Sequence, residues 1–230
     1  MLDFVLNFLF PPVCVICGKI DKDWICTNCK KRIEKYEKFK DVNKEDINKI
    51  FSYLINDCRE KIFFDEFFYC FEYKKIIRNL LLKYKFSDCA YLCNFFGNVI
   101  LNNKKVSEIF ENYDIMIPVP MDKIKKKQRG YNQTELITKI TEKTMEKELV
   151  IDNNSLIKIK TTKTQSTLNA EERIVNVKNA FYVKNVEKIQ GKKIIIFDDI
   201  ITTGSTINEI SRILKIAGAE KILVLVIAKD

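Results

Sequence analysis

One stretch, residues 193–206, constrains the fold of this chain more than any other. After Lys193 come four large apolar residues, a run too short for an amphipathic helix and suited to a strand buried on both faces. Two adjacent carboxylates, Asp198 and Asp199, follow where such a strand is expected to end. A turn rich in hydroxyl side chains comes next, and apolar residues then recur every three or four positions over residues 207–217. The stretch therefore predicts a strand, an acidic pair, a turn and a helix.

The turn has the features of a phosphate site. A turn that leads into a helix exposes unpaired backbone N–H groups and the positive end of the helix dipole, and both favour an anion. Gly204 allows a ligand close to the backbone, and hydroxyl donors surround it at Thr202, Thr203, Ser205 and Thr206. The acidic pair would repel a bare phosphate. We therefore expect a ligand that also carries sugar hydroxyls or a divalent cation.

Other phosphate-binding turns fit the stretch less well. A P-loop needs Lys after its last Gly, where this chain has Ser205, and a dinucleotide-binding turn needs more glycines. An ordinary capped connection needs one Thr or Ser, not four around a glycine behind two acids. The stretch resembles the motif with which type I phosphoribosyltransferases bind phosphoribosyl pyrophosphate (PRPP).

Four of the eight cysteines form two C-x-x-C pairs, Cys14 with Cys17 and Cys26 with Cys29. This spacing predicts a tetrahedral zinc site closed by four thiolates, with a structural role. Two disulfides or a redox C-x-x-C are the alternatives. Disulfides fit a cytoplasmic chain poorly, and a redox motif is expected once, at a strand–helix junction, not twice. A zinc ribbon can also be a docking surface, in which case Trp24 is a candidate stacking residue; more often such a Trp packs over the ribbon.

The remaining cysteines, Cys58, Cys70, Cys89 and Cys93, do not form a C-x-x-C pair. We expect each of them to pack as a small buried hydrophobic residue. The chain has no histidine, so a metal site must use Cys or carboxylates.

The formal net charge of +9 permits a nucleic-acid partner but does not identify one, since Lys is the default surface residue in this composition.

A length of 230 residues allows one core and a small appendage. No apolar run reaches the roughly 18 residues that span a membrane. The apolar segment 1–10 has neither the basic region nor the cleavage site of a signal peptide. We therefore expect a cytoplasmic protein without a transmembrane segment.

Strand and helix patterns alternate along the rest of the chain. Strands are predicted at 67–73, 114–120, 155–159, 180–183, 193–197 and 221–228, and helices at 76–86, 91–101, 132–147 and 207–217. Alternation of this kind indicates an α/β domain with a mainly parallel sheet flanked by helices. We expect a zinc ribbon over 1–35, a linker with short helices over 36–65 and the α/β domain over 66–230.

Two further polar segments are expected to meet the acidic pair at the carboxyl edge of the sheet. The first follows the strand that ends at Pro120 and is basic through residues 123–129, where Arg129 could bind a phosphate with two hydrogen bonds. The second, residues 158–169, ends near Arg173 and is long and cationic, as expected of a lid over a phosphorylated ligand.

Taken in order, these features resemble the ComF family, specifically its ComFC type, over nearly the full length. The resemblance rests on both C-x-x-C pairs, the PRPP-type stretch and four further segments, residues 82–86, 118–120, 129–133 and 163–176, with Ala217-Gly218-Ala219 near the end. The short spacing between the cysteine pairs and the absence of a glycine in 83–87 depart from the family pattern. The resemblance implies a zinc ribbon fused to a type I phosphoribosyltransferase domain.

The resemblance also implies roles for individual residues. Asp198 and Asp199 would bind the ribose hydroxyls, directly or through Mg2+, and residues 202–206 would hold the 5′-phosphate. Pro120 and Arg129 would face the pyrophosphate, while Lys163 and Arg173 would come from the mobile loop. The implied catalytic residues are Asp198, Asp199, Lys163 and Arg173; the implied PRPP-binding residues are Asp198, Asp199, Thr202, Thr203, Gly204, Ser205, Thr206, Pro120 and Arg129.

The family is associated with natural transformation, in which single-stranded DNA is handled on the cytoplasmic side of the membrane with a ComFA-type DNA helicase. Two hypotheses follow, and both can hold: a protein that binds PRPP and Mg2+ and acts in DNA uptake, and a phosphoribosyltransferase with an unknown acceptor. A third is a PRPP-sensing regulator without catalysis. The segment 63–73 and the two helices after it occupy the acceptor-binding position and show no base-binding motif, which favours the DNA-uptake role.

Overall fold

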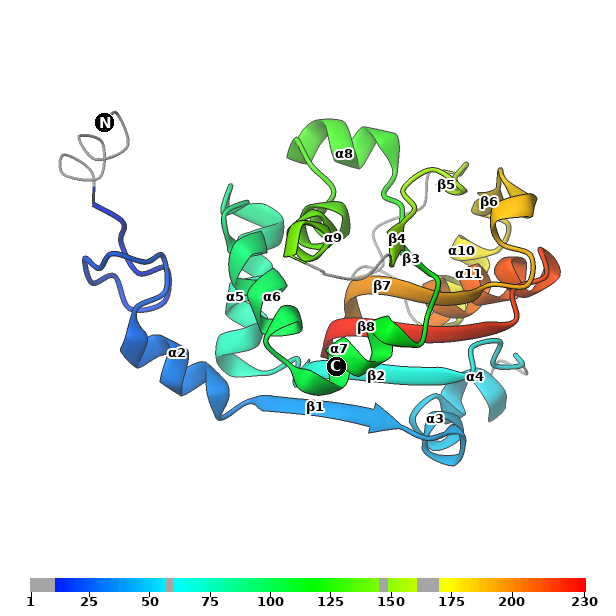
Figure 1. Cartoon of the computed structure of the whole chain (residues 1–230), viewed down its shortest axis with the longest axis horizontal. Coiled ribbons are helices and arrows are strands. Elements are labelled where there is room, and N and C mark those ends of the chain that lie inside the picture. The colour runs from blue at the N-terminus through cyan, green and yellow to red at the C-terminus, as the bar shows by residue number, and fades with distance from the viewer. Residues whose placement is uncertain (1–10, 57–59, 145–148, 161–169) are drawn as a thin grey trace.

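The structure is a computed structural model that describes residues 11–56, 60–144, 149–160 and 170–230. A six-stranded sheet forms its centre (Figure 1). Its strands, in spatial order, are β1 (Glu37–Val42), β2 (Glu66–Glu72), β8 (Lys221–Lys229), β7 (Lys193–Ile201), β3 (Ile115–Pro118) and β4 (Val150–Ile151). Every neighbouring pair is parallel except β1 with β2. The predicted α/β class with a mainly parallel sheet is confirmed.

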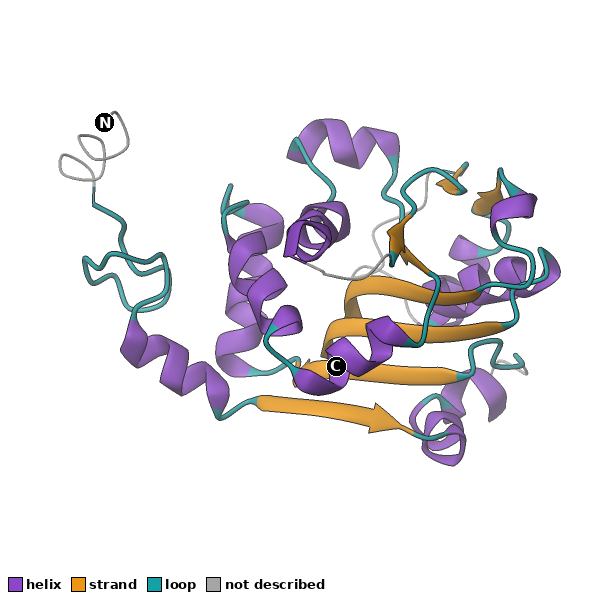
Figure 2. Ribbon diagram, viewed as in Figure 1, coloured by secondary structure: helices purple, strands orange, loops and turns teal. Residues whose placement is uncertain are grey.

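Helices cover both faces of this sheet, and alternate residues of each strand point to opposite sides. One apolar cluster joins Phe68, Ile195 and Leu225 to α5 (Lys75–Phe86), α6 (Leu92–Leu101), α7 (Lys104–Glu111) and α9 (Gln133–Thr144). The other joins Phe67, Ile196 and Val224 to α3 (Lys44–Ile50), α4 (Ser52–Asn56), α10 (Ala170–Val177) and α11 (Ser205–Ile216). Figure 2 shows the strands side by side with the helices around them.

Three sequence-based expectations differ from the structure. β7 does not end before the acidic pair, because it continues to Ile201 and its ladder pairs Asp198 with Val226. The basic segment expected as a loop is α8 (Lys123–Arg129), which Asp122 caps at its start and Gly130 ends with a left-handed backbone. The short strands β5 (Leu156–Lys158) and β6 (Phe181–Val183) form a separate antiparallel sheet, followed by the 3-10 helix η2 (Val186–Lys188).

The N-terminal part lies beside α5 and α6 (Figure 1). A single bridge pairs Val13 with Ile20 across the first cysteine turn, and α2 (Thr27–Glu34) begins after Cys26. The segment 36–65, expected as a linker, contributes α3, α4 and the edge strand β1 of the main sheet. The boundaries at residues 35 and 65 stay predictions. Within the described ranges, no helix has the length and apolar character needed to span a bilayer.

Candidate functional site

The carboxyl ends of β3 and β7 open into a cleft of about 580 Å³. Loop and helix residues that follow several strands line it, as expected at the carboxyl edge of a parallel sheet. Seven residues predicted from the sequence line this cleft: Pro120, Arg129, Arg173, Asp198, Asp199, Thr202 and Thr206. Thr203 and Gly204 form the turn after the lining residue Thr202, and Ser205 begins α11 just before the lining residue Thr206. Lys163 lies outside the described residues.

The acidic pair is held at the floor of the cleft by contacts on both carboxylates. The Asp199 backbone N–H donates to Asp198 Oδ1 at 2.8 Å. Lys85, from the last turn of α5, places its Nζ 2.9 Å from Asp199 Oδ1, and the Asp199 side chain is only 8% exposed. Burial and the neighbouring Asp199 charge raise the pKa of Asp198 to about 8, although Lys85 opposes this shift. Burial and the Asp199 charge therefore favour the protonated form of Asp198 in the free protein.

The turn after β7 requires glycine at one position. Gly204 has φ 80, and a Cβ there would lie 2.9 Å from the Phe51 ring. This glycine precedes α11, and no side chain in the described part of the protein caps that helix. The Thr203 and Ser205 hydroxyls lie 2.9 Å apart within the turn. The positive end of α11 thus meets the cleft without a protein carboxylate in the capping position.

Cations gather around the acidic pair. Lys85, Lys125, Arg129, Lys158 and Arg173 all line the cleft, from four different parts of the chain. Arg173 Nη1 donates to Thr202 Oγ1 at 3.3 Å. Burial lowers the pKa of Arg129 and of Lys158, and repulsion from Lys125 lowers that of Lys158 further. Crowded, partly desolvated cations of this kind favour an anionic ligand with several charges.

A tyrosine pair joins the two walls of the cleft. Tyr84 donates its hydroxyl to Gln133 O at 2.9 Å, and Tyr131 donates to Tyr84 O at 2.6 Å, with the rings 5.9 Å apart. These bonds fix α5 against the 129–133 segment. Gln133 is 2% exposed and lines the cleft, and within the described residues its Nε2 has no hydrogen-bond acceptor. A buried amide donor without an acceptor is costly, so it is suited to a ligand oxygen.

Sequence reasoning missed one of these cations, Lys85, and placed Lys158 at the site but in a different element. Lys85 lies in the 82–86 segment that supported the family resemblance, but no charge pairing in the sequence linked it to Asp199. Lys158 was expected at the start of the cationic lid, whereas the structure places it at the end of β5 with its ammonium 5.5 Å from the Phe181 ring centre. Both placements depend on contacts between residues far apart in the chain.

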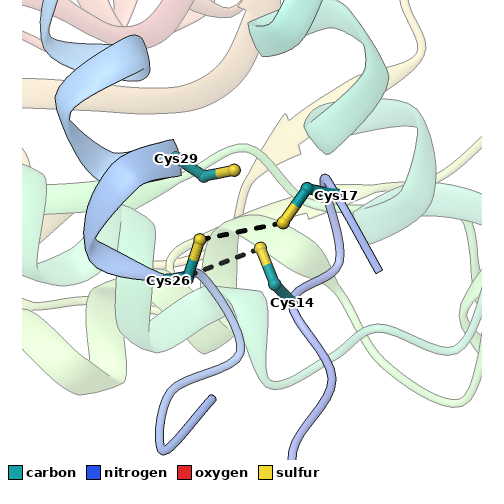
Figure 3. Close-up of side chains that lie close together, drawn as sticks. All are labelled: Cys14, Cys17, Cys26 and Cys29. Carbon is teal, nitrogen blue, oxygen red and sulfur yellow. Dashed lines mark hydrogen bonds between the residues drawn. The ribbon is translucent and has the colours of Figure 1, made fainter. Parts of the chain in front are cut away.

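The two C-x-x-C pairs come together at the N-terminal side of the molecule (Figure 3). The sulfur atoms of Cys14, Cys17, Cys26 and Cys29 all lie within 4.8 Å of one another, and Cys17 Sγ is 3.8 Å from Cys26 Sγ. A tetrahedron of Zn–S bonds near 2.3 Å has edges of about 3.8 Å. Backbone N–H donors lower the pKa of Cys14 to about 6 despite its burial, whereas burial and the neighbouring thiols raise the pKa of Cys29. The four cysteines fit one tetrahedral metal ion such as zinc.

The ribbon is attached to the α/β domain by specific contacts. Trp24 stacks on Tyr91 with ring centres 4.3 Å apart, and Lys83 Nζ donates to Val15 O at 2.6 Å. Of the two roles considered for Trp24, the structure therefore shows packing, with 45% of the residue still exposed.

The other cysteines are not part of the cluster. Cys70 and Cys89 are buried and Cys93 is half-buried, and the described residues contain no disulfide. Burial raises the pKa of the Cys70 and Cys93 thiols, which keeps them protonated. They pack as small hydrophobic residues, and Cys58 lies outside the described residues.

Comparison with known proteins gives a consistent result. A sequence profile of the phosphoribosyl transferase domain matches residues 101–230. Competence protein F of Haemophilus influenzae is 26% identical over 227 residues, which cover 96% of this chain and 97% of that protein. Competence protein ComFC of Bacillus subtilis is 26% identical over 145 residues, which cover 63% of this chain and 55% of that protein.

Two further matches are more limited. DNA utilization protein YhgH of Escherichia coli is 32% identical over 111 residues, 48% of this chain and 47% of that protein. Among solved structures, a hypoxanthine phosphoribosyltransferase from Staphylococcus aureus superposes with a TM-score of 0.34 at 12% identity, covering 63% of this chain and 64% of that chain.

Proposed function

The chain belongs to the phosphoribosyl transferase domain family, and from that premise we propose that its cleft binds PRPP together with Mg2+. One observation carries the proposal: an acidic pair, an uncapped helix N-terminus and five cations line or border the same cleft. A phosphorylated ribose needs all three, because its hydroxyls donate to carboxylates while its phosphates accept from cations and backbone N–H groups.

The phosphate groups would occupy the two ends of the cleft. The 5′-phosphate would lie on residues 202–206, where α11 begins without a side-chain cap. The pyrophosphate faces Pro120 and Arg129, and the Gln133 amide supplies a donor beside them. Arg173 donates to Thr202 and would therefore add positive charge at the 5′-phosphate end. The catalytic role implied for Lys163 stays a prediction.

Asp198 and Asp199 would hold the ribose hydroxyls and Mg2+. The donor set fits a hard cation, since two carboxylates lie side by side and both burial and the Asp199 charge raise the pKa of Asp198, a cost that a bound cation would relieve. Bound Mg2+ supplies charge neutralisation of the pyrophosphate. The cations of the cleft then stabilise pyrophosphate as it leaves, so transfer of the ribosyl group needs little help from a general acid or base.

The biological role that we propose is DNA uptake, with single-stranded DNA handled on the cytoplasmic side of the membrane beside a ComFA-type helicase. The names of the relatives, competence protein and DNA utilization protein, support this role. The net charge of +9 is compatible with it. An active phosphoribosyltransferase with a small-molecule acceptor is the second candidate, which the family membership favours, and a PRPP-sensing regulator is the third.

We propose that the four cysteines bind one structural zinc ion. All four ligands come from the protein, which leaves no open position for water or substrate. Cys14, Cys26 and Cys29 belong to the same apolar cluster as α5 and α6, so the metal would also stabilise the docking of the ribbon.

Titration calorimetry with PRPP in Mg2+ tests the central proposal. We expect saturable binding by the natural chain and a loss of about tenfold or more in affinity when Asp198→Asn and Asp199→Asn are combined. The pair Glu187→Gln and Glu220→Gln replaces two exposed carboxyl groups by amides in the same way and is the matched control. Unchanged PRPP affinity in the acidic-pair variant would refute the assignment of the site.

Pyrophosphate release, measured with and without single-stranded DNA, separates the candidate roles. Release that requires DNA makes DNA part of the reaction. PRPP binding with no release under either condition indicates a binding or sensing role, and release that requires an added small molecule identifies a transferase acceptor.

A further inference from the structure

A second cleft, of about 450 Å³, lies between the zinc ribbon and the α/β domain. We call it the ribbon cleft. Its walls are the ribbon with α2, the edge strand β1, and the exposed side of α6. It shares no lining residue with the candidate PRPP site, so its role is independent of the function proposed above.

The ribbon cleft is acidic although the protein as a whole is basic. Glu34, at the end of α2, and Glu37, at the start of β1, both line it. Within the described residues, neither side chain has a hydrogen-bond or ion-pair partner. The single lysine of the lining, Lys30, is already paired with Asp23 at 2.7 Å. Burial and the charge of Glu34 raise the pKa of Glu37, so this carboxylate is not fully solvated.

The opposite wall offers amide groups at helical spacing. Asn94, Asn98 and Asn102 follow one another at every fourth position of α6 and its C-cap, and all three line the ribbon cleft. In the described part of the chain, their side chains have no hydrogen-bond partner, and each amide carries both donors and an acceptor. Such a row can bind the backbone of an extended peptide.

Aromatic rings complete the lining. Trp24 and its stacking partner Tyr91 lie at the ribbon, and Phe95 lies on α6. Phe39 enters from β1, where a bulge between Glu37 and Lys40 and an unusual φ of 40 reorient the strand. A positive φ costs energy for an aromatic residue, and bulges commonly redirect a side chain towards a site.

These features exclude two other ligands. Unpaired carboxylates would repel the phosphates of a nucleic acid, so the stacking role considered for Trp24 does not apply here. Within the described ranges, the cysteine cluster is the only group of three or more side chains that could hold a metal ion, and the two glutamates are not part of it.

We propose that the ribbon cleft binds an extended segment of a partner protein that carries arginine or lysine side chains. A guanidinium or ammonium group donates to Glu34 and Glu37, the stem of that side chain packs on the aromatic rings, and the peptide backbone pairs with the α6 amides. Charge complementarity with the two glutamates selects this class of segment.

Trp24 gives a direct test, because it is the only tryptophan of the chain and lines the cleft. The full zinc-loaded protein is titrated with a short blocked peptide of alternating alanine and arginine, and the emission of Trp24 is recorded. We expect a saturable change that weakens with added salt and that a peptide with glutamate in place of arginine does not produce.

The variant Glu34→Gln with Glu37→Gln should lower the peptide affinity about tenfold, while the surface pair Glu187→Gln with Glu220→Gln should leave it unchanged. Equal losses in both variants would overturn the proposal, since they would reflect net charge alone. A response to single-stranded DNA that needs Glu34 and Glu37 would also overturn it. So would a dimer in sedimentation that the Glu34 and Glu37 substitutions dissociate, because a second copy would then fill the cleft.

Discussion

At the scale of single residues, the candidate site is defined by charges that the chain leaves only partly balanced. Asp199 pairs with Lys85, whereas the Asp198 carboxylate accepts a hydrogen bond from the Asp199 backbone N–H. Buried charge is tolerated where a ligand supplies the missing partner, and perturbed pKa values commonly mark such positions.

The raised pKa of Asp198 makes stability depend on pH. The folded protein binds this proton more tightly than the unfolded chain does, so the stabilising contribution is present below about pH 4 and is lost as pH rises towards about 8. Asp198→Asn removes the cost of ionising the group. We predict that the melting temperature of the variant minus that of the natural chain increases from pH 5 to pH 8. A difference that stays constant over this range would show that Asp198 ionises normally.

Lys85 is predicted to stabilise the free protein through Asp199. Lys85→Met leaves the buried Asp199 carboxylate without its cation and should lower the unfolding free energy by about 1–3 kcal/mol, since the lysine is partly exposed. Denaturant unfolding measures this loss. In the background Asp199→Asn, the same lysine substitution should cost much less, and equal costs in both backgrounds would mean that the pair contributes no coupling energy.

At the scale of elements, the sequence predicted those strands and helices whose apolar residues recur with a regular local period. The strands β2, β3, β7 and β8 and the helices α5, α6, α9 and α11 all occur within a few residues of their expected ranges. The end of β7 was wrong because the ladder with β8 continues through the acidic pair, and a partner strand is invisible to local pattern. β1 was missed because its alternation is mostly charged, as is common for an edge strand.

The parts of the site that are contiguous in sequence could also be predicted. The acidic pair and the turn before α11 are contiguous in sequence and connect a strand to a helix, so their placement followed from the elements alone. Lys85 was not predicted, because it reaches Asp199 through the packing of α5 against the 129–133 segment, which the hydrogen bonds of Tyr84 and Tyr131 support. Contacts across 47 and 49 positions cannot be found by spacing.

The turn before α11 is predicted to tolerate no side chain at Gly204. Gly204→Ala forces alanine into φ 80 and brings its Cβ to 2.9 Å from Phe51, so we expect a loss of about 2–4 kcal/mol in unfolding free energy. Gly191→Ala is the matched control, because φ is 70 there but nothing lies within 4 Å of the added Cβ. Similar losses in both variants would show that backbone strain, not the contact with Phe51, dictates glycine at position 204.

At the scale of the whole molecule, the ribbon and the α/β domain behave as one unit. They share an apolar cluster, the stacked rings of Trp24 and Tyr91, and the ribbon cleft between them. The sequence predicted the metal ligands from their spacing but gave no sign of where the ribbon would dock, since the contacts come from α5 and α6.

Zinc removal should therefore disturb more than the ribbon. A chelator is expected to release about one zinc per chain, lower the melting temperature and change the emission of Trp24 as its contact with Tyr91 is lost. Cys29→Ser should give the same emission change without chelator. Loss of zinc with no change in Trp24 emission would show that docking does not depend on the metal.

A crystal structure of the protein with PRPP and Mg2+ tests the central claim most directly. The account predicts the 5′-phosphate within hydrogen-bonding distance of the turn at residues 202–206, the ribose hydroxyls or Mg2+ at Asp198 and Asp199, and the pyrophosphate beside Arg129. PRPP bound outside this cleft, or inside it with its ribose away from the acidic pair, would contradict the account.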